Sequence, residues 1–127
     1  GMPGAHDVAE APDGTIWVAD NFQRRLVRFD ENLEELGVLS GPQFGFVGPR
    51  YMTIDPDGIL IVADQDAHRV LKIDPFTQEV LGIVGTGVPG KGPNLLDDPE
   101  GAALRGSEYF FADSDNNRIV KYVVALN

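Results

Sequence analysis

The sequence predicts an all-β fold made of three copies of one small antiparallel sheet, and two observations lead to this prediction. The 15 Gly and 9 Pro residues are spread along the whole chain of 127 residues, which is typical of many short strands joined by tight turns. In addition, a four-residue motif of two apolar residues followed by Ala-Asp occurs three times, at 17–20, 61–64 and 110–113. Repeats spaced by about 40 to 50 residues indicate a repeat architecture.

Each copy is predicted to begin with a short strand, at 6–11 in the first copy and at 51–55 in the second. Both strands lead into a Pro-Asp-Gly turn, at 12–14 and at 56–58. Pro fixes φ at one turn position and Gly accepts a positive φ at another, so this triplet favours a hairpin. The third copy keeps only Leu104-Arg105-Gly106 at this place.

The second strand of each copy contains this repeated motif, and the third strand begins with an arginine five residues after the aspartate that ends the motif. These third strands are predicted at 25–29, 69–73 and 118–122. The alternation of apolar and polar residues in them excludes a solenoid of helices. A fourth strand is predicted at 36–40 and at 80–84, whereas the third copy reaches Asn127 before an equivalent segment. The sequence therefore predicts eleven strands.

Four short strands in about 45 residues are typical of one blade of a β-propeller. The predicted blades cover about residues 3–46, 47–96 and 97–127 of a single domain, with the Gly-rich segment 85–96 as a longer connection before the third blade. Propellers close at about four to eight blades. We therefore expect the three blades to be half of a six-bladed propeller that a homodimer closes. The alternative is that the chain is a fragment of a larger propeller protein.

The charge and the missing cysteines narrow the possible partners. Ten Lys and Arg against 20 Asp and Glu give a formal charge of −10, and the pI is about 4.4. Affinity for nucleic acids rests mainly on neutralisation of phosphates by Lys and Arg. We therefore expect no nucleic acid and no membrane surface among the partners. The absence of Cys excludes a disulfide framework, a thiolate zinc site and a Cys nucleophile.

Targeting signals are not evident in the sequence. No apolar run reaches the roughly 18 residues of a membrane span, and the N-terminal residues do not have the pattern of a signal peptide. The sequence therefore predicts a soluble protein and leaves its compartment open. The first two residues, Gly1-Met2, resemble a cloning remnant, so the natural N-terminus can be missing.

The repeated aspartates and arginines are predicted to have a structural role. Each aspartate stands where the second strand turns toward the third, and a carboxylate there can accept backbone N–H bonds and pair with the arginine. Repetition in every copy argues against a catalytic aspartate, and no catalytic residue is assigned. The residues of this predicted structural set are Asp20, Arg25, Asp64, Arg69, Asp113 and Arg118.

Three other residues share one position at the start of the first strand of each copy: His6, Arg50 and Glu100. Because the innermost strand of a propeller blade lines the central channel, we expect these side chains to face it. There they can bind a small anion, a metal ion or a peptide terminus. The alternative is a ring of solvated or mutually paired side chains. His68, in the turn before Arg69, is predicted to be an exposed turn residue.

Two parts of the chain carry a resemblance to a known family. The segment 11–20 followed by 25–30, and the segment 113–122, resemble the NHL repeat. This resemblance implies a β-propeller, commonly of six blades. It also implies a use as an interaction platform or, in some families, as an enzyme.

The segment Ala5-His6-Asp7-Val8-Ala9 is similar to the innermost-strand motif of one NHL subfamily, the peptidyl-α-hydroxyglycine α-amidating lyases. The similarity implies a zinc ion in the channel, held by histidines from several blades, with His6 as the ligand in this chain. Only His6 matches, because Arg50 and Glu100 stand at the equivalent positions. Two copies of the chain would together offer two histidines and two glutamates to a metal, while Arg50 would oppose the cation.

These observations leave three hypotheses for the function. The first is a non-catalytic scaffold that binds a protein, a peptide or a small ligand and needs no cofactor. The second is a lyase-like or hydrolase-like enzyme with zinc or calcium in the channel near His6. The third is a fragment of a larger propeller protein. The chain has two histidines in all, and this small number of histidine ligands for a metal ion favours the scaffold.

Overall fold

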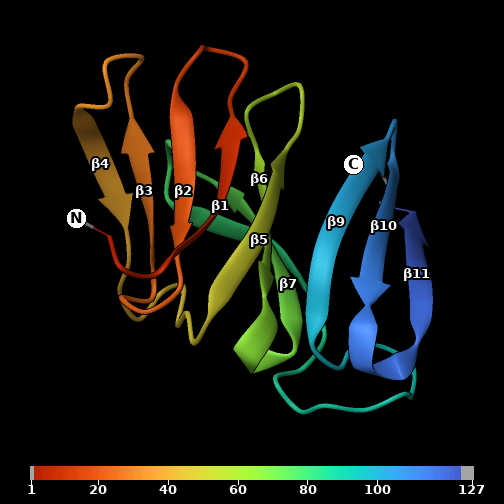
Figure 1. Ribbon diagram of the computed structural model, residues 1–127. Coiled ribbons are helices and arrows are strands. Elements are labelled where there is room, and N and C mark those ends of the chain that lie inside the picture. The colour runs from red at the N-terminus through yellow and green to blue at the C-terminus, as the bar shows by residue number, and fades with distance from the viewer. Residues whose placement is uncertain (1, 124–127) are drawn as a thin grey trace.

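The computed structural model describes residues 2–123, which form three antiparallel sheets side by side (Figure 1). The strand orders are β1-β2-β3-β4, β5-β6-β7-β8 and β9-β10-β11, so each sheet follows the order of the chain. We call these sheets blades 1, 2 and 3. The strands are β1 Ala5–Glu10, β2 Ile16–Asp20, β3 Arg25–Phe29, β4 Glu35–Leu39, β5 Pro49–Ile54, β6 Leu60–Asp64, β7 Arg69–Asp74, β8 Glu79–Val84, β9 Pro99–Arg105, β10 Glu108–Asp113 and β11 Arg118–Val123. The predicted all-β fold with propeller-type blades is confirmed.

The strand boundaries differ slightly from the predicted ones. The first strand of blade 2 begins at Pro49, two residues before the predicted start, and that of blade 1 ends at Glu10 instead of residue 11. Two short 3₁₀ turns, η1 Gln65–Ala67 and η2 Ser114–Asn116, were not predicted. The part of the predicted third blade after Val123 lies outside the described residues. None of the helices within 2–123 is long and apolar enough to cross a membrane.

The turn between the second and third strands has one geometry in all three blades. Its last residue is left-handed in each case, with φ of 54° at Arg24, 52° at His68 and 54° at Asn117. The next residue is the arginine that opens the third strand, paired in register with the repeated aspartate. The constant spacing of five residues between the aspartate and the arginine therefore reflects one turn conformation that recurs in all three blades.

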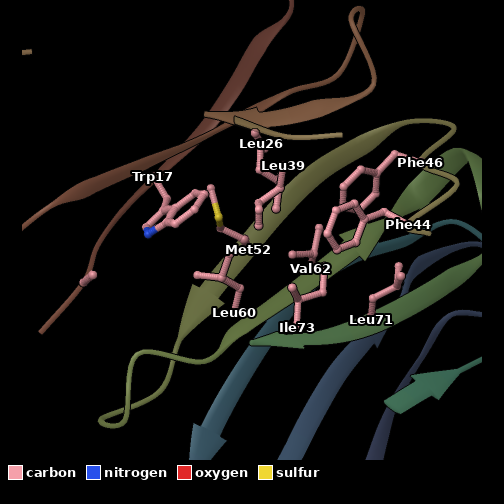
Figure 2. Packing of buried hydrophobic residues seen from close by; sticks show 12 residues of the cluster. Trp17, Leu26, Leu39, Phe44, Phe46, Met52, Leu60, Val62, Leu71 and Ile73 are labelled. Atoms are coloured by element: carbon pink, nitrogen blue, oxygen red, sulfur yellow. The ribbon is translucent and has the colours of Figure 1, made fainter. Parts of the chain in front are cut away.

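The core consists of two apolar layers, one at each contact between neighbouring blades. Figure 2 shows the first layer, in which Trp17, Leu26 and Leu39 of blade 1 meet Met52 and Leu60 of blade 2. In the second layer, side chains of β6 and β7 meet the aromatic side chains of β10. The buried members of this second layer are Ile61, Ala63, Val70, Leu96, Tyr109 and Phe111. Blade 2 is therefore covered on both faces, which explains why all five residues of β6 are buried.

The outer faces of blades 1 and 3 have no sheet packed on them within the described residues. On blade 1 this face carries Val8 and Leu33, which are 61% and 71% exposed. On blade 3 it carries Ile119 and Val123, which are 68% and 65% exposed. Apolar side chains are therefore exposed to solvent on the outer faces of both terminal blades.

Candidate functional site

The first strands of the three blades are neighbours, because β1 contacts β5 and β5 contacts β9. At the start of each strand, the pairing with the second strand skips one residue. The skipped residues are His6, Arg50 and Glu100, so all three predicted channel residues are β-bulges. A bulge re-aims its side chain out of the ladder and is frequent near functional sites. The structure thus places the three residues at one end of three adjacent strands.

His6 is exposed and contacts blade 2 through an aromatic pair. Its ring lies 5.0 Å from the ring of Tyr51, edge to face, with an angle of 76° between the planes. The next residue, Asp7, accepts a hydrogen bond of 2.9 Å from the backbone N–H of Met52. Asp7 therefore joins the first strands of blades 1 and 2 directly beside His6. This link fixes the position of His6 relative to the start of β5.

Arg50 is held within its own blade by a carboxylate. Its Nη2 lies 3.3 Å from Oδ2 of Asp66, in the turn after β6, and both side chains are partly exposed. Its Nε is buried and has no hydrogen-bond partner among the described residues. The guanidinium thus has a spare donor at this end of the strands. His6 and Arg50 are not directly paired in the structure.

Glu100 is linked to blade 2 through Gln65. The amide nitrogen of Gln65 donates to Oδ2 of Asp98 at 3.1 Å and to Oε1 of Glu100 at 3.4 Å. Gln65 is only 7% exposed, and its Oε1 has no partner within residues 2–123. A buried amide oxygen without a donor costs folding free energy. Gln65 therefore connects blades 2 and 3 and keeps one unused acceptor near Glu100.

Carboxylates gather around Glu100 at the junction of blades 2 and 3. Burial raises the pKa of Asp115, and the negative charges of Asp98, Asp97 and Glu100 raise it further, while His68 acts in the opposite direction. The shifted pKa indicates that these carboxylates repel one another. The junction of blades 2 and 3 therefore gathers several carboxylates, in agreement with the charge of −10 on the chain.

His68 belongs to this junction and is not the exposed turn residue that was predicted. Its side chain is only 22% exposed, because the turn packs against the start of β9. Nδ1 of His68 accepts a hydrogen bond of 3.1 Å from the backbone N–H of Asp98 and lies 3.4 Å from Oδ1 of Asp97. The sequence did not signal this contact, because it joins residues of two different blades.

The repeated aspartates pair with the repeated arginines in all three blades. Nε of the arginine donates to Oδ2 of the aspartate at 2.8 Å for Arg25 and Asp20, 3.0 Å for Arg69 and Asp64, and 2.6 Å for Arg118 and Asp113. All three aspartates are fully buried. These pairs lie at the same end of the blades as His6, Arg50 and Glu100, since each aspartate faces the residue that precedes the bulge.

The second carboxylate oxygen of each aspartate differs between the blades. Oδ1 of Asp64 accepts the backbone N–H groups of Val47 and Gly48, at 3.1 and 2.8 Å. Oδ1 of Asp113 accepts that of Asp97 at 2.7 Å. Burial alone would raise the pKa of Asp113, but the hydrogen bonds and the charge of Arg118 outweigh it and lower the pKa. Asp20 Oδ1 has no partner among the described residues.

Sequence reasoning missed the residue that precedes the first strand of each blade. This residue is Gly4, Gly48 or Asp98. The backbone carbonyls of Gly4 and Gly48 accept hydrogen bonds from the turn after the second strand, whereas in blade 3 the carbonyl of Asp97 has this role. A Cβ on Gly48 would collide with the carboxylate of Asp66, and one on Gly4 would collide with the backbone of Phe22. Asp98 is tolerated with a φ of 56°. The signal was present as a glycine one residue before the strand in the first two repeats.

The site as described offers hydrogen bonding and negative charge. Within residues 2–123, no group of three or more His, Cys, Asp or Glu side chains is placed to hold a metal ion. His6 in particular has an aromatic ring, Tyr51, as its close neighbour. The chemistry that the arrangement supports is recognition of a ligand by paired and unpaired polar groups at the ends of three strands.

Comparisons with known proteins agree with this fold. No family model matches the chain. The curated protein SUPPRESSOR OF QUENCHING 1, chloroplastic, of Arabidopsis thaliana is 30% identical over an alignment of 108 residues that covers 75% of this chain and 10% of that protein. Among solved structures, hydrazine synthase of Kuenenia stuttgartiensis matches 98% of this chain with a TM-score of 0.68 at 18% identity. Virginiamycin B lyase of Staphylococcus aureus matches 97% with a TM-score of 0.65 at 17% identity.

The shares of the chains that match are unequal. A protein of unknown function from Bacteroides caccae has a TM-score of 0.72 with 94% of this chain, at 12% identity. This chain covers 37%, 42% and 46% of the hydrazine synthase, the lyase and the Bacteroides protein, and about a tenth of the curated plant relative. The similarity therefore establishes propeller blades and covers less than half of each of these proteins.

Proposed function

We propose that the chain is an NHL-type propeller segment that acts as a non-catalytic binding scaffold, with its binding end at the starts of β1, β5 and β9. The observation that carries this proposal is the shared bulge. His6, Arg50 and Glu100 leave the strand ladder at the same position in three neighbouring blades. The rest of each strand pairs regularly, so the irregularity is confined to the end where polar groups of three blades come together.

The charge of this end supports a ligand that carries positive charge. Asp115 has a raised pKa because of burial and of the neighbouring carboxylates, and a cationic ligand would relieve that repulsion. A peptide or small molecule with lysine-like amines has this chemistry, since an ammonium group only donates hydrogen bonds.

A tri-lysine peptide is a suitable probe for this proposal. Calorimetric titration should give saturable binding that weakens with added salt. The substitution Glu100→Gln should weaken binding by about fivefold, because a charge contact of this kind contributes about 1 kcal/mol. Glu10→Gln is the matched control, since Glu10 is exposed near the other end of β1. Binding that is absent, or equally weakened by both substitutions, would contradict the proposal.

A metal-dependent lyase or hydrolase with His6 as a ligand is the competing function from the sequence. Titration of the same protein with zinc or calcium, in place of the peptide, distinguishes the two functions. The scaffold proposal expects no stoichiometric metal that depends on His6. Stoichiometric zinc that is lost in His6→Ala would favour the enzyme and would overturn the scaffold.

We further propose that two copies of the chain close one six-bladed propeller, with blade 3 of each copy against blade 1 of the other. Supporting this, the uncovered face of blade 3 presents Ile119 at the strand position where Leu26 and Val70 are buried by the next blade. The uncovered face of blade 1 presents Val8 and Leu33. Sedimentation should give the mass of two chains, and Ile119→Lys should reduce it to one. A single-chain mass for the unmodified protein at about micromolar concentration would contradict this assembly.

A further inference from the structure

We propose that His68 is a proton-operated switch at the junction of blades 2 and 3, where the charge of its imidazole decides how the segment before β9 is held. Nδ1 of His68 faces two groups of this segment, the backbone N–H of Asp98 at 3.1 Å and Oδ1 of Asp97 at 3.4 Å. The first group is a donor and the second is an acceptor. One ring nitrogen cannot bind both in the same protonation state.

In the neutral state, Nδ1 of His68 carries a lone pair and accepts the hydrogen bond from the backbone N–H of Asp98. The ring proton is then on Nε2, because the hydrogen bond of one ring nitrogen sets the tautomer. The carboxylate of Asp97 faces the same lone pair and receives no hydrogen bond from it. The neutral ring therefore links blade 2 to the backbone of Asp98.

In the protonated state, both ring nitrogens of His68 are donors. Nδ1–H can then donate to the carboxylate of Asp97 in a charge-assisted hydrogen bond. The N–H of Asp98 now faces another donor and loses its acceptor. Asp98 has a left-handed φ of 56°, which is uncommon for a residue with a Cβ and persists only where neighbouring contacts hold it. We therefore expect the backbone at Asp98 to turn when His68 gains its proton.

The surroundings of His68 are rich in carboxylates. The charged groups nearest to it are Asp97 and Asp98 before β9, Glu100 in β9, Asp115 in η2, and Asp66 and Arg69 in its own turn. The carboxylates attract an imidazolium, and Arg69 repels it but is paired with the buried Asp64. The segment 85–87 also packs against this turn and contains no titratable residue. The charges around the ring therefore oppose the uptake of a proton only through Arg69.

The switch reaches beyond His68, because Asp98 also holds Gln65. Oδ2 of Asp98 accepts a hydrogen bond of 3.1 Å from the side-chain amide of Gln65, and the same amide donates to Glu100 at 3.4 Å. A turn of the backbone at Asp98 therefore changes two links between blades 2 and 3. The inference concerns this junction alone, so it does not depend on the proposed scaffold function or on the dimer.

NMR of the whole protein between about pH 8 and about pH 5 tests the switch, since an imidazole changes its charge in this range. At the upper pH, the ring nitrogen shifts of His68 should show the proton on Nε2. As the pH falls, the protection of the Asp98 amide against hydrogen exchange should fall by about fivefold or more, because its hydrogen bond is lost. Protection is calculated against the intrinsic exchange rate at each pH.

His68→Gln is the decisive variant, because an amide oxygen can accept the hydrogen bond of Asp98 but does not titrate. Protection of the Asp98 amide should then be the same at both pH values. His6→Gln is the matched control, since it removes the other histidine of the chain and should leave the response of Asp98 unchanged.

Two results on the unmodified protein would overturn the inference without any variant. These are a ring proton on Nδ1 of His68 at the upper pH, and protection of Asp98 that stays constant as the pH falls. An equal response of Asp98 in His68→Gln would assign the change to the carboxylates and would also overturn it.

Discussion

Blade 2 and the two outer blades have the same repeat sequence pattern in different surroundings. The same position of the third strand holds Leu26, which is fully buried, Val70, which is 3% exposed, and Ile119, which is 68% exposed. All three residues are apolar and β-branched or bulky, as the repeat requires. The difference in burial therefore comes from the neighbouring blade and not from the residue. The repeat pattern in the sequence predicts which blade faces are apolar. Whether such a face is buried depends on whether a neighbouring blade packs against it.

The buried aspartates provide the sharpest test of this comparison. Asp64 in blade 2 pairs with Arg69 and accepts two backbone N–H groups, whereas Oδ1 of Asp20 in blade 1 has no partner within residues 2–123. We expect Asp64→Ala to lower the free energy of unfolding by about 3–5 kcal/mol, because it leaves buried donors and the arginine unpaired. Asp20→Ala should cost about 1–2 kcal/mol less, since it removes fewer hydrogen bonds.

Urea unfolding followed by the fluorescence of Trp17, which is buried in blade 1, measures both variants. Asp64→Asn is a useful third variant, because it keeps the size and removes the charge. Equal losses for the alanine variants of Asp64 and Asp20 would show that the backbone hydrogen bonds at Val47 and Gly48 do not distinguish the two blades.

The covered and uncovered faces provide the second test. Val70→Ala should lower the free energy of unfolding by about 2 kcal/mol, because two buried methyl groups are removed and a cavity remains. Ile119→Ala should change it by less than about 0.5 kcal/mol in the single chain. The measurement is urea unfolding at several protein concentrations. An Ile119 effect that grows with concentration would indicate that a second copy covers this face, and a large effect at all concentrations would contradict the exposure of Ile119.

Much of the fold could be predicted because the repeat makes its pattern visible three times. The spacing between the aspartate and the arginine, as in Asp64 and Arg69, predicted the second and third strands to the residue at their junction. The turn triplet at 12–14 predicted the first hairpin for the same reason. These features depend on local backbone chemistry, which the sequence expresses directly.

The candidate site was harder to predict, because its contacts join different blades. Equivalence of His6, Arg50 and Glu100 followed from the repeat, but their status as bulges did not, since a bulge depends on pairing with the second strand. The contact of His68 with the start of β9 and the link from Gln65 to Glu100 are also contacts between blades. One sequence gives the residues of such a contact and not the distance between them.

Asp115 gives the smallest expected effect and tests the electrostatic difference between blades 2 and 3. Asp66, its equivalent in blade 2, lies 3.3 Å from Arg50, whereas blade 3 has Glu100 at the position of that arginine. Burial and the charges of Asp98, Asp97 and Glu100 raise the pKa of Asp115, so its ionised form destabilises the folded state. This destabilisation is present above the raised pKa and disappears as the pH falls through it.

We therefore expect Asp115→Asn to raise Tm slightly at neutral pH, and Asp66→Asn to lower it or leave it unchanged. The gain from Asp115→Asn should shrink below about pH 4 and in about 1 M salt, where the charges are screened. Thermal unfolding of the two variants across pH and salt measures this, and a gain that persists in acid would assign the effect to packing and not to charge.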